Sequence, residues 1–356
     1  MSAKTIAKSG GGQDRVVYFN ILRAIAPIFV VFIHAAVTFD AQTTKIHFFQ
    51  EFGRWAVPIF FMISGALLLN PKKEMSLKAL YKKNIRHMLV ALLAWSVFYA
   101  ILFAFFDDKE GSKAHLLGYN IFGGGAYHMW FLFSLLAIYI ILPFLRNIVT
   151  NKKLFGYSLF VGLIICFALP FVDTIIEIIA HLIDSHFLLG YIGGGSLFSK
   201  ISVELRLFSL AFYFLFGYFL ATENFDKKMR WTIYGLGIAS AAVDLAWVVV
   251  GERVVGMAST ANYYFLPVLL MSGALFLAVR YMFARIKRTP KIIGFMAKHS
   301  FGIYLSHLAI LIFVVDKWGI IGSGLPMIIV GTLIAYLISL VISWTLSKIP
   351  VLRKVV

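Results

Sequence analysis

Long apolar stretches separated by short polar segments limit most strongly how this chain can fold. A stretch of about twenty apolar residues is long enough to cross the hydrocarbon core of a bilayer as a helix. Of the 356 residues 61% are hydrophobic and only 14% are charged, which is not the composition of a soluble domain of this size. We therefore expect an all-α, polytopic integral membrane protein with about ten transmembrane helices, forming one domain over residues 1–356. The expected spans are 17–39, 48–70, 86–106, 128–148, 154–172, 204–222, 231–250, 262–282, 299–315 and 324–347.

The positive charges predict how the spans are oriented. Most of the 33 Lys and Arg fall in the basic tail 1–15, in alternate short segments and at the C-terminal end. Because cytoplasmic loops carry an excess of Lys and Arg, we expect both termini in the cytoplasm. The expected inner segments between them are 71–85, 149–153, 223–230 and 283–298. The net charge of +17 is thus explained by membrane topology, and we expect no nucleic-acid partner.

Several kinds of chemistry lack their sequence signatures. Cys166 is the only cysteine, so neither an intramolecular disulfide nor a cysteine-based metal site is possible within the chain, and we expect no metal. The chain has no GxxxxGK[ST], GxGxxG, HExxH or GxSxG motif in a suitable context. ATP-driven transport, dinucleotide chemistry, zinc proteolysis and serine-hydrolase chemistry are therefore unsupported.

The first expected span contains Arg23 and His34, with ten residues between them. Ionisable side chains are costly in the bilayer and usually face protein or an aqueous cavity. Eleven steps of about 100° bring both side chains to nearly the same helix face, about 16 Å apart along the axis. Asn20 and Pro27 share that face, and Pro27 can open the helix between the two ionisable residues. Ordinary packing or snorkelling would explain either residue alone, whereas the pair favours a functional site.

Other polar residues near span ends or within spans are further candidates. Lys83 and Arg86 lie about one turn apart at the expected inner surface, where two cations can bind phosphate, although positive-inside charge also explains them. His128 and Trp130 begin the fourth span; Trp130 is typical of an interfacial anchor, and the pair can alternatively contact a sugar.

Two more candidates lie within spans. His307 is in the middle of the ninth span, whose helix we expect to begin with Ser300 as its N-cap. Asp244, in the seventh span, needs a partner, and we consider the second N–H of His34 for that role.

Taken in order, five runs resemble motifs of the acyltransferase-3 family of bacterial membrane acyltransferases. They are NILRAIAPIFVVFIH, RWAVPIFFMISGALL, KNIRHML, YHMWFLFSLLAIYIILP and SFGIYLSHLAIL, and they extend from the first span to the ninth. The first run is similar to the family motif of arginine or lysine, ten residues and histidine. The YHMWFL form is most similar to surface-polysaccharide O-acetyltransferases of the enterobacterial common antigen type. Asn20, where relatives often have aspartate, and Lys83, where they have arginine, depart from the family pattern.

The resemblance implies transfer of an acyl group, commonly acetyl from acetyl-CoA, to a hydroxyl of an envelope polysaccharide or lipid-linked sugar. It implies a multi-pass protein of the bacterial cytoplasmic (inner) membrane, with the lipid bilayer as surroundings. His34 and Arg23 become the catalytic pair, and Lys83, Arg86 and Arg23 the residues that bind the acyl-CoA donor. We assign the acceptor to a set of outer or intramembrane residues, namely His128, Trp130, Arg54, Asp244 and His307.

The proposed chemistry follows from the placement of these residues. His34 is a suitable general base, because imidazole titrates near neutral pH; an acyl-histidine intermediate is the other route. The longest outer loops, 107–127 and 173–203, are expected to determine which acceptor binds. A transporter or flippase for an envelope precursor is the alternative class, although the chain has no visible inverted repeat.

Overall fold

The computed structural model describes residues 17–39, 44–106, 127–185, 206–255, 263–316 and 324–356. Within these ranges the chain is helical and contains no strand, so the expected all-α class is confirmed. The elements are α1 (Val17–Phe39), α2 (Thr44–Gly53), α3 (Ala56–Leu68), α4 (Leu77–Ala79), η2 (Leu80–Ile85), α5 (Arg86–Phe106), η3 (Tyr127–Met129), α7 (Trp130–Thr150), α8 (Lys152–Leu163), η4 (Ile164–Ala168), α9 (Leu169–Leu182), α12 (Arg206–Thr222), α13 (Lys227–Val250), η5 (Gly251–Val255), α14 (Leu266–Met282), α15 (Lys291–Asp316), α16 (Leu325–Lys348) and η6 (Leu352–Lys354).

Eight helical stretches of the described residues are long and apolar enough to cross a membrane. They are Val17–Phe39, His47–Leu68, Leu77–Ala104, Trp130–Thr150, Lys152–Leu182, Lys227–Val250, Lys291–Phe313 and Leu325–Lys348. The shorter helices α12 and α14, of 17 residues each, are also apolar and coincide with the sixth and eighth expected spans. The protein is thus a polytopic membrane protein. Its orientation in the membrane stays a prediction, and so does the cytoplasmic location of the tail 1–15, which lies outside the described residues.

The second expected span, 48–70, is not a single helix. It is divided into α2 and α3 by a turn at Arg54 and Trp55. Pro58 has no N–H to donate to the carbonyl of Arg54 four residues earlier, so an uninterrupted helix would lose a hydrogen bond there. The break allows Arg54 to fold back onto Glu51 in the preceding turn.

Two other boundaries also differ from expectation. Helix continues from Lys152 to Leu182, so part of the expected outer loop 173–203 is helical. The π-helix η4 ends at Ala168, two residues before Pro170, and its wider turns accommodate the missing N–H of that residue. Likewise α15 begins at Lys291, and Ser300 is not its N-cap: the Ser300 hydroxyl donates to the Ala297 carbonyl at 3.0 Å inside the helix.

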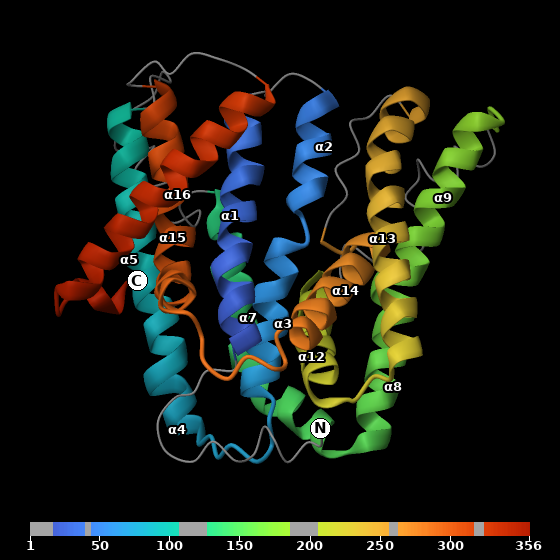
Figure 1. Ribbon diagram of the computed structural model, residues 1–356, viewed down its shortest axis with the longest axis horizontal. Helices are drawn as coiled ribbons and strands as arrows, with labels where there is room; N and C mark the ends of the chain where they lie inside the picture. The colour runs from blue at the N-terminus through green and yellow to red at the C-terminus, as the bar shows by residue number, and fades with distance from the viewer. Residues whose placement is uncertain (1–16, 40–43, 107–126, 186–205, 256–262, 317–323) are drawn as a thin grey trace.

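Helix α1 lies near the middle of the bundle, between α2 and α3 on one side and α15 and α16 on the other (Figure 1). Its neighbour α3 packs directly against α12 through glycines on both helices. A Cβ at Gly65 would lie 2.1 Å from the Phe214 carbonyl oxygen, and one at Gly217 would lie 2.2 Å from that of Met62. Small residues allow membrane helices to approach this closely, and the crossing holds α3 against the rest of the bundle.

Candidate functional site

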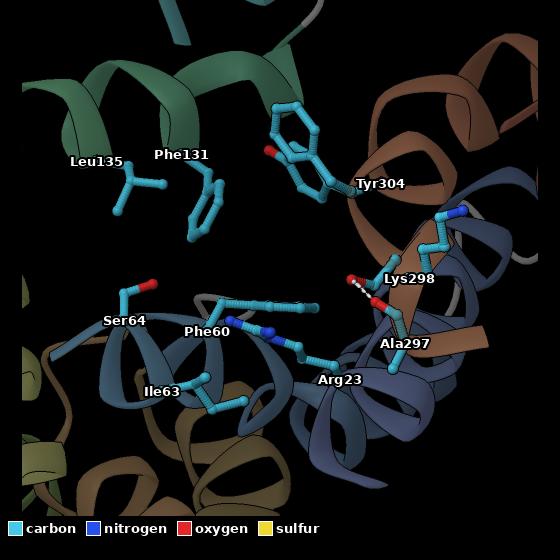
Figure 2. A pocket seen from close by; sticks show the side chains of 11 residues that line it. Arg23, Phe60, Ile63, Ser64, Phe131, Leu135, Ala297, Lys298 and Tyr304 are labelled. Carbon is cyan, nitrogen blue, oxygen red and sulfur yellow. Dashed lines mark hydrogen bonds between the residues drawn. The ribbon is translucent and has the colours of Figure 1, made fainter. Parts of the chain in front are cut away.

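A cavity of about 230 Å³ lies between α1, α3, α7 and α15 (Figure 2). Its polar lining comes from Arg23 of α1, Ser64 of α3, and Lys298, Ser300 and Tyr304 of α15. The remaining lining side chains are Phe60, Ile63, Phe131, Leu135, Ala297 and Phe301. The cavity therefore has two cationic residues on otherwise largely apolar walls, which suits a long ligand with an anionic end and an uncharged arm.

Arg23 reaches across the cavity rather than outward to solvent. In Figure 2 its side chain extends from α1 toward α3, next to Phe60, while Phe131 and Leu135 approach from α7. Arg23 also lies close enough to Tyr139 of α7 for an electrostatic interaction, and Tyr139 hydrogen-bonds the Ser64 side chain. The guanidinium is therefore held inside the bundle, and interfacial snorkelling does not describe its position.

Three histidines from separate helical segments form a cluster next to this cavity. The ring centroids of His34 and His307 are 5.0 Å apart, those of His128 and His307 are 5.2 Å apart, and those of His34 and His128 are 6.3 Å apart. His307 is 0% exposed and His128 is 1% exposed, whereas His34 is partly buried. Within the described residues, no group of three or more His, Cys, Asp or Glu is arranged to hold a metal ion. Imidazole rings are also the side chains that most readily take up and release protons near neutral pH.

Tyrosines hold the backbone around the cluster. The Tyr304 hydroxyl donates to the His128 carbonyl oxygen, and the Tyr99 hydroxyl donates to the Leu305 carbonyl at 2.8 Å while accepting from the Ala309 N–H at 3.2 Å. Tyr304 also lines the cavity, and its ring centroid is 5.9 Å from that of His307. Tyr304 therefore separates the cavity from the histidines and contacts both.

The same helix, α15, meets both ionisable residues of α1. Arg23 shares the cavity with Ala297, Lys298 and Tyr304, and His34 lies beside His307 at the next turn of α15. With ten residues between them on α1, Arg23 lines the cavity and His34 belongs to the histidine cluster, so one face of α1 borders both parts of the site.

A second polar cluster joins three of the expected acceptor residues. Arg54 forms a bidentate ion pair with the buried Glu51, at 2.6 and 2.7 Å, and its guanidinium lies 5.6 Å from the ring centroid of Tyr263. The Tyr263 ring is in turn 5.1 Å from that of Trp130. Asp244 is 1% exposed and near enough to Glu51 and Arg54 to interact electrostatically with both. Its pairing with His34 stays a prediction.

Lys83 and Arg86 are not brought into this site. Both side chains are exposed, Lys83 in the π-helix η2 and Arg86 at the start of α5, and neither lines the Arg23 cavity. Lys298 lines it instead. From the sequence, Lys298 was interpreted only as one of the positive charges of the inner segment 283–298. Its position two residues before the SFGIYLSH run was the one signal that could have assigned it to the site.

Sequence reasoning also missed Tyr304, Tyr99 and Tyr263. Tyr304 belongs to the SFGIYLSH run, but tyrosine there is equally typical of an ordinary apolar helix. Tyr99 and Tyr263 carry no motif, and only packing between distant segments reveals them. Most of the expected acceptor loops 107–127 and 173–203, namely residues 107–126 and 186–203, lies outside the described residues.

The fold and the site together define an all-helical, multi-pass membrane protein whose central helices enclose a cationic cavity and a buried histidine cluster. A family model described as an acyltransferase domain matches residues 16–348, which is nearly the whole chain. The chain therefore belongs to the acyltransferase-3 family.

One curated relative is similar over a limited region. It is the Bacillus subtilis (strain 168) protein named "Putative membrane-bound acyltransferase YfiQ", with 33% identity over 101 residues. The match covers 27% of this chain and 26% of that protein, so the chain matches about a quarter of the relative's length. No solved structure matches the chain significantly.

Proposed function

We propose that this protein is a membrane O-acyltransferase that moves an acyl group, most simply acetyl, from cytosolic acyl-CoA to a hydroxyl of an envelope glycan or lipid-linked saccharide. One observation carries the proposal: in a chain of the acyltransferase-3 family, a cavity lined by Arg23 and Lys298 lies next to the histidine cluster around His34, with Tyr304 between them. The proposed location is the bacterial inner membrane, and the proposed acceptor class includes polysaccharides like the enterobacterial common antigen.

The cavity supports binding of the acyl-CoA donor. Acyl-CoA combines several phosphate charges with a long uncharged arm, and Arg23 and Lys298 can bind the charged end while the apolar walls accept the arm. Lys83 and Arg86 are exposed cations that we propose as further phosphate contacts near the entrance. The separation of about 16 Å between Arg23 and His34 along α1 is comparable to the reach of the arm.

His34 is the proposed general base. It removes the proton from the acceptor hydroxyl, the oxygen attacks the thioester carbonyl, and the C–S bond breaks as the new ester forms. His34 then gives the proton to the departing CoA sulfur, so no proton is gained or lost overall. In the covalent route His34 itself first takes the acyl group and passes it to the hydroxyl, and trapping of an acyl-enzyme would distinguish the two routes.

The Trp130, Tyr263 and Arg54 cluster is the proposed acceptor side of the site. Aromatic rings can pack against sugar rings, and the carboxylate of Asp244 and the guanidinium of Arg54 can hydrogen-bond hydroxyls. His128 and His307, whose rings lie beside that of His34, are proposed to complete the wall of the acceptor pocket.

The decisive experiment is label transfer by the purified protein in lipid vesicles. With labelled acetyl-CoA and envelope glycan, the wild type should place label on the glycan, and His34→Ala should lower the rate at least about 100-fold because the base is lost. His299→Ala is the matched control, since His299 is a buried histidine of α15 that bonds Ser343 and does not line the cavity, and it should keep the wild-type rate.

Two outcomes would contradict this proposal. Full transfer by His34→Ala would remove His34 from the chemistry. Movement of the glycan across the vesicle membrane without a new ester would indicate a transporter instead.

A further inference from the structure

His307 has a fixed arrangement of its ring proton. Its Nδ1 lies 2.6 Å from the carbonyl oxygen of Tyr304, and a carbonyl oxygen can only accept a hydrogen bond. Nδ1 must therefore carry the hydrogen. In a neutral imidazole this leaves Nε2 as an acceptor with a lone pair.

That acceptor nitrogen is buried and unused in the described part of the chain. His307 is 0% exposed, and its Nε2 has no hydrogen-bond partner among the described residues. Burying an acceptor without a partner is unfavourable, so such groups in native proteins usually have a role. A nearby N–H is needed to satisfy it.

His34 is the nearest titratable ring. Its centroid is 5.0 Å from that of His307 and the two rings are tilted by 37°, which is within range of one N–H···N hydrogen bond between ring edges. The His128 ring is at 5.2 Å but nearly perpendicular, at 79°, and the Tyr304 ring is at 5.9 Å. The Tyr99 hydroxyl of α5 is already donated to Leu305. From α16, the buried titratable residue is Tyr336, which packs in the cluster that contains Ile303.

We propose that His307 is a positioning residue for His34: a small rotation of the two neighbouring rings lets its Nε2 accept the N–H of His34 during the reaction, which leaves the other nitrogen of His34 as the base that faces the acceptor hydroxyl. This inference rests on the proposed acyl transfer. The His307 ring replaces the carboxylate that orients a catalytic histidine in other enzymes, and a neutral acceptor avoids burying a negative charge.

The hydrogen shared by the two rings stays on His34 throughout. The hydroxyl proton goes to the opposite nitrogen of His34 and then to the CoA sulfur, while His307 stabilises the intermediate imidazolium through its accepted hydrogen bond. His307 therefore affects the chemical step and not the binding of acyl-CoA, because it does not line the Arg23 cavity.

Two substitutions separate this role from a structural one. His307→Gln can place an amide oxygen near the former Nε2 but loses the donor to the Tyr304 carbonyl. His307→Asn can keep that donor but has no acceptor at the Nε2 position. If His307 positions His34, kcat should fall from wild type to His307→Gln and further to His307→Asn, because only Gln keeps an acceptor for His34. If His307 only holds the Tyr304 carbonyl, His307→Asn should be the more active of the two variants.

The test is label transfer from acetyl-CoA to glycan by the full chain in lipid vesicles. We expect His307→Asn to lower kcat about 100-fold and His307→Gln to retain at least tenfold more activity than Asn, with KM for acetyl-CoA within about twofold of wild type. His299→Asn, a buried histidine of the same helix that bonds Ser343, is the control and should keep the wild-type kcat.

Thermal unfolding of each variant in detergent checks that it is folded. Equal activity of Asn and wild type, or higher activity of Asn than of Gln, would overturn the role of His307 while leaving acyl transfer intact. Loss of kcat in proportion to lost folded protein would also overturn it. Absence of transfer by the wild type would instead overturn the proposed function itself, so the two failures are distinguishable.

Discussion

Arg23 and Lys298 approach the same cavity from α1 and α15, but their environments differ. Arg23 is partly buried and beside Tyr139 and Phe60, whereas Lys298 is exposed and has greater freedom to move. A guanidinium held in place loses little freedom when it binds phosphate, so Arg23 should contribute more to donor binding than Lys298.

Neutralising either cation should therefore weaken donor binding without changing the chemical step. We expect Arg23→Gln to raise KM for acetyl-CoA about tenfold, equivalent to ~1.4 kcal/mol, and Lys298→Gln to raise it less. Steady-state kinetics of label transfer measures both. Lys227→Gln, at the start of α13, is a charge-matched control that should keep the wild-type KM.

The expected kinetic pattern is specific. If Arg23→Gln lowered kcat and left KM unchanged, Arg23 would act on the reacting group and not on the phosphates of the donor.

At the scale of elements, the site depends on how closely α3 crosses α12. Gly217 faces the backbone of Met62, which cannot rotate away as a side chain can. Ile63 and Ser64, next along α3, line the cavity, so the crossing determines the position of one cavity wall. Arg146 of α7 also fixes the end of α3, because its guanidinium donates to the Leu68 carbonyl at 2.7 Å.

Gly217→Ala should consequently destabilise the protein by about 1–3 kcal/mol through overpacking. The thermal unfolding midpoint in detergent measures this, together with a fall in transfer rate. Gly235→Ala in α13 is the matched control, since a Cβ there meets nothing within 4 Å and alanine favours helix. Equal unfolding midpoints for the two variants would show that α3 and α12 can separate at little cost.

At the scale of the whole molecule, two of the segments expected in the cytoplasm, 71–85 and 223–230, lie at the same end of the bundle (Figure 1). The region of α4 and the linker between α12 and α13 lie at the lower end of Figure 1, and the end of α9 lies at the upper end. This arrangement agrees with alternating crossings, while the direction relative to the cell is predicted by the charges alone.

Cysteine labelling tests that direction. Cys166 is the only cysteine and is buried, so Cys166→Ser provides a background for single cysteines. In intact cells a membrane-impermeant maleimide should label Asp184→Cys and leave Lys73→Cys unlabelled. Both residues are exposed; Lys73 shortly precedes α4 and Asp184 follows α9, and the region of α4 and the end of α9 lie at opposite ends of the bundle. After the membrane is opened both should react, and the reverse pattern in intact cells would invert the topology.

The sequence alone was sufficient for properties that depend on neighbouring residues. Apolar length predicted α1 at its observed bounds, and helical periodicity brought Arg23 and His34 to the same neighbour, α15. Hydropathy did not predict interruptions within a span. The turn at Arg54 and the π-helix before Pro170 interrupt stretches that hydropathy alone predicts as continuous α-helix.

Only the tertiary structure decided which helices meet. His128 and His307 lie far from His34 in the chain, and no spacing rule relates them, because helix contacts in a membrane arise from many weak packing interactions and close approach at small residues. For the same reason Lys298 lines the cavity while Lys83 and Arg86, equally basic and near the same surface, remain outside it. The sequence by itself determined the spans and the face of α1 that carries the ionisable pair, since both follow from local length and periodicity. The partners of that face depend on contacts between distant segments, which local patterns do not encode.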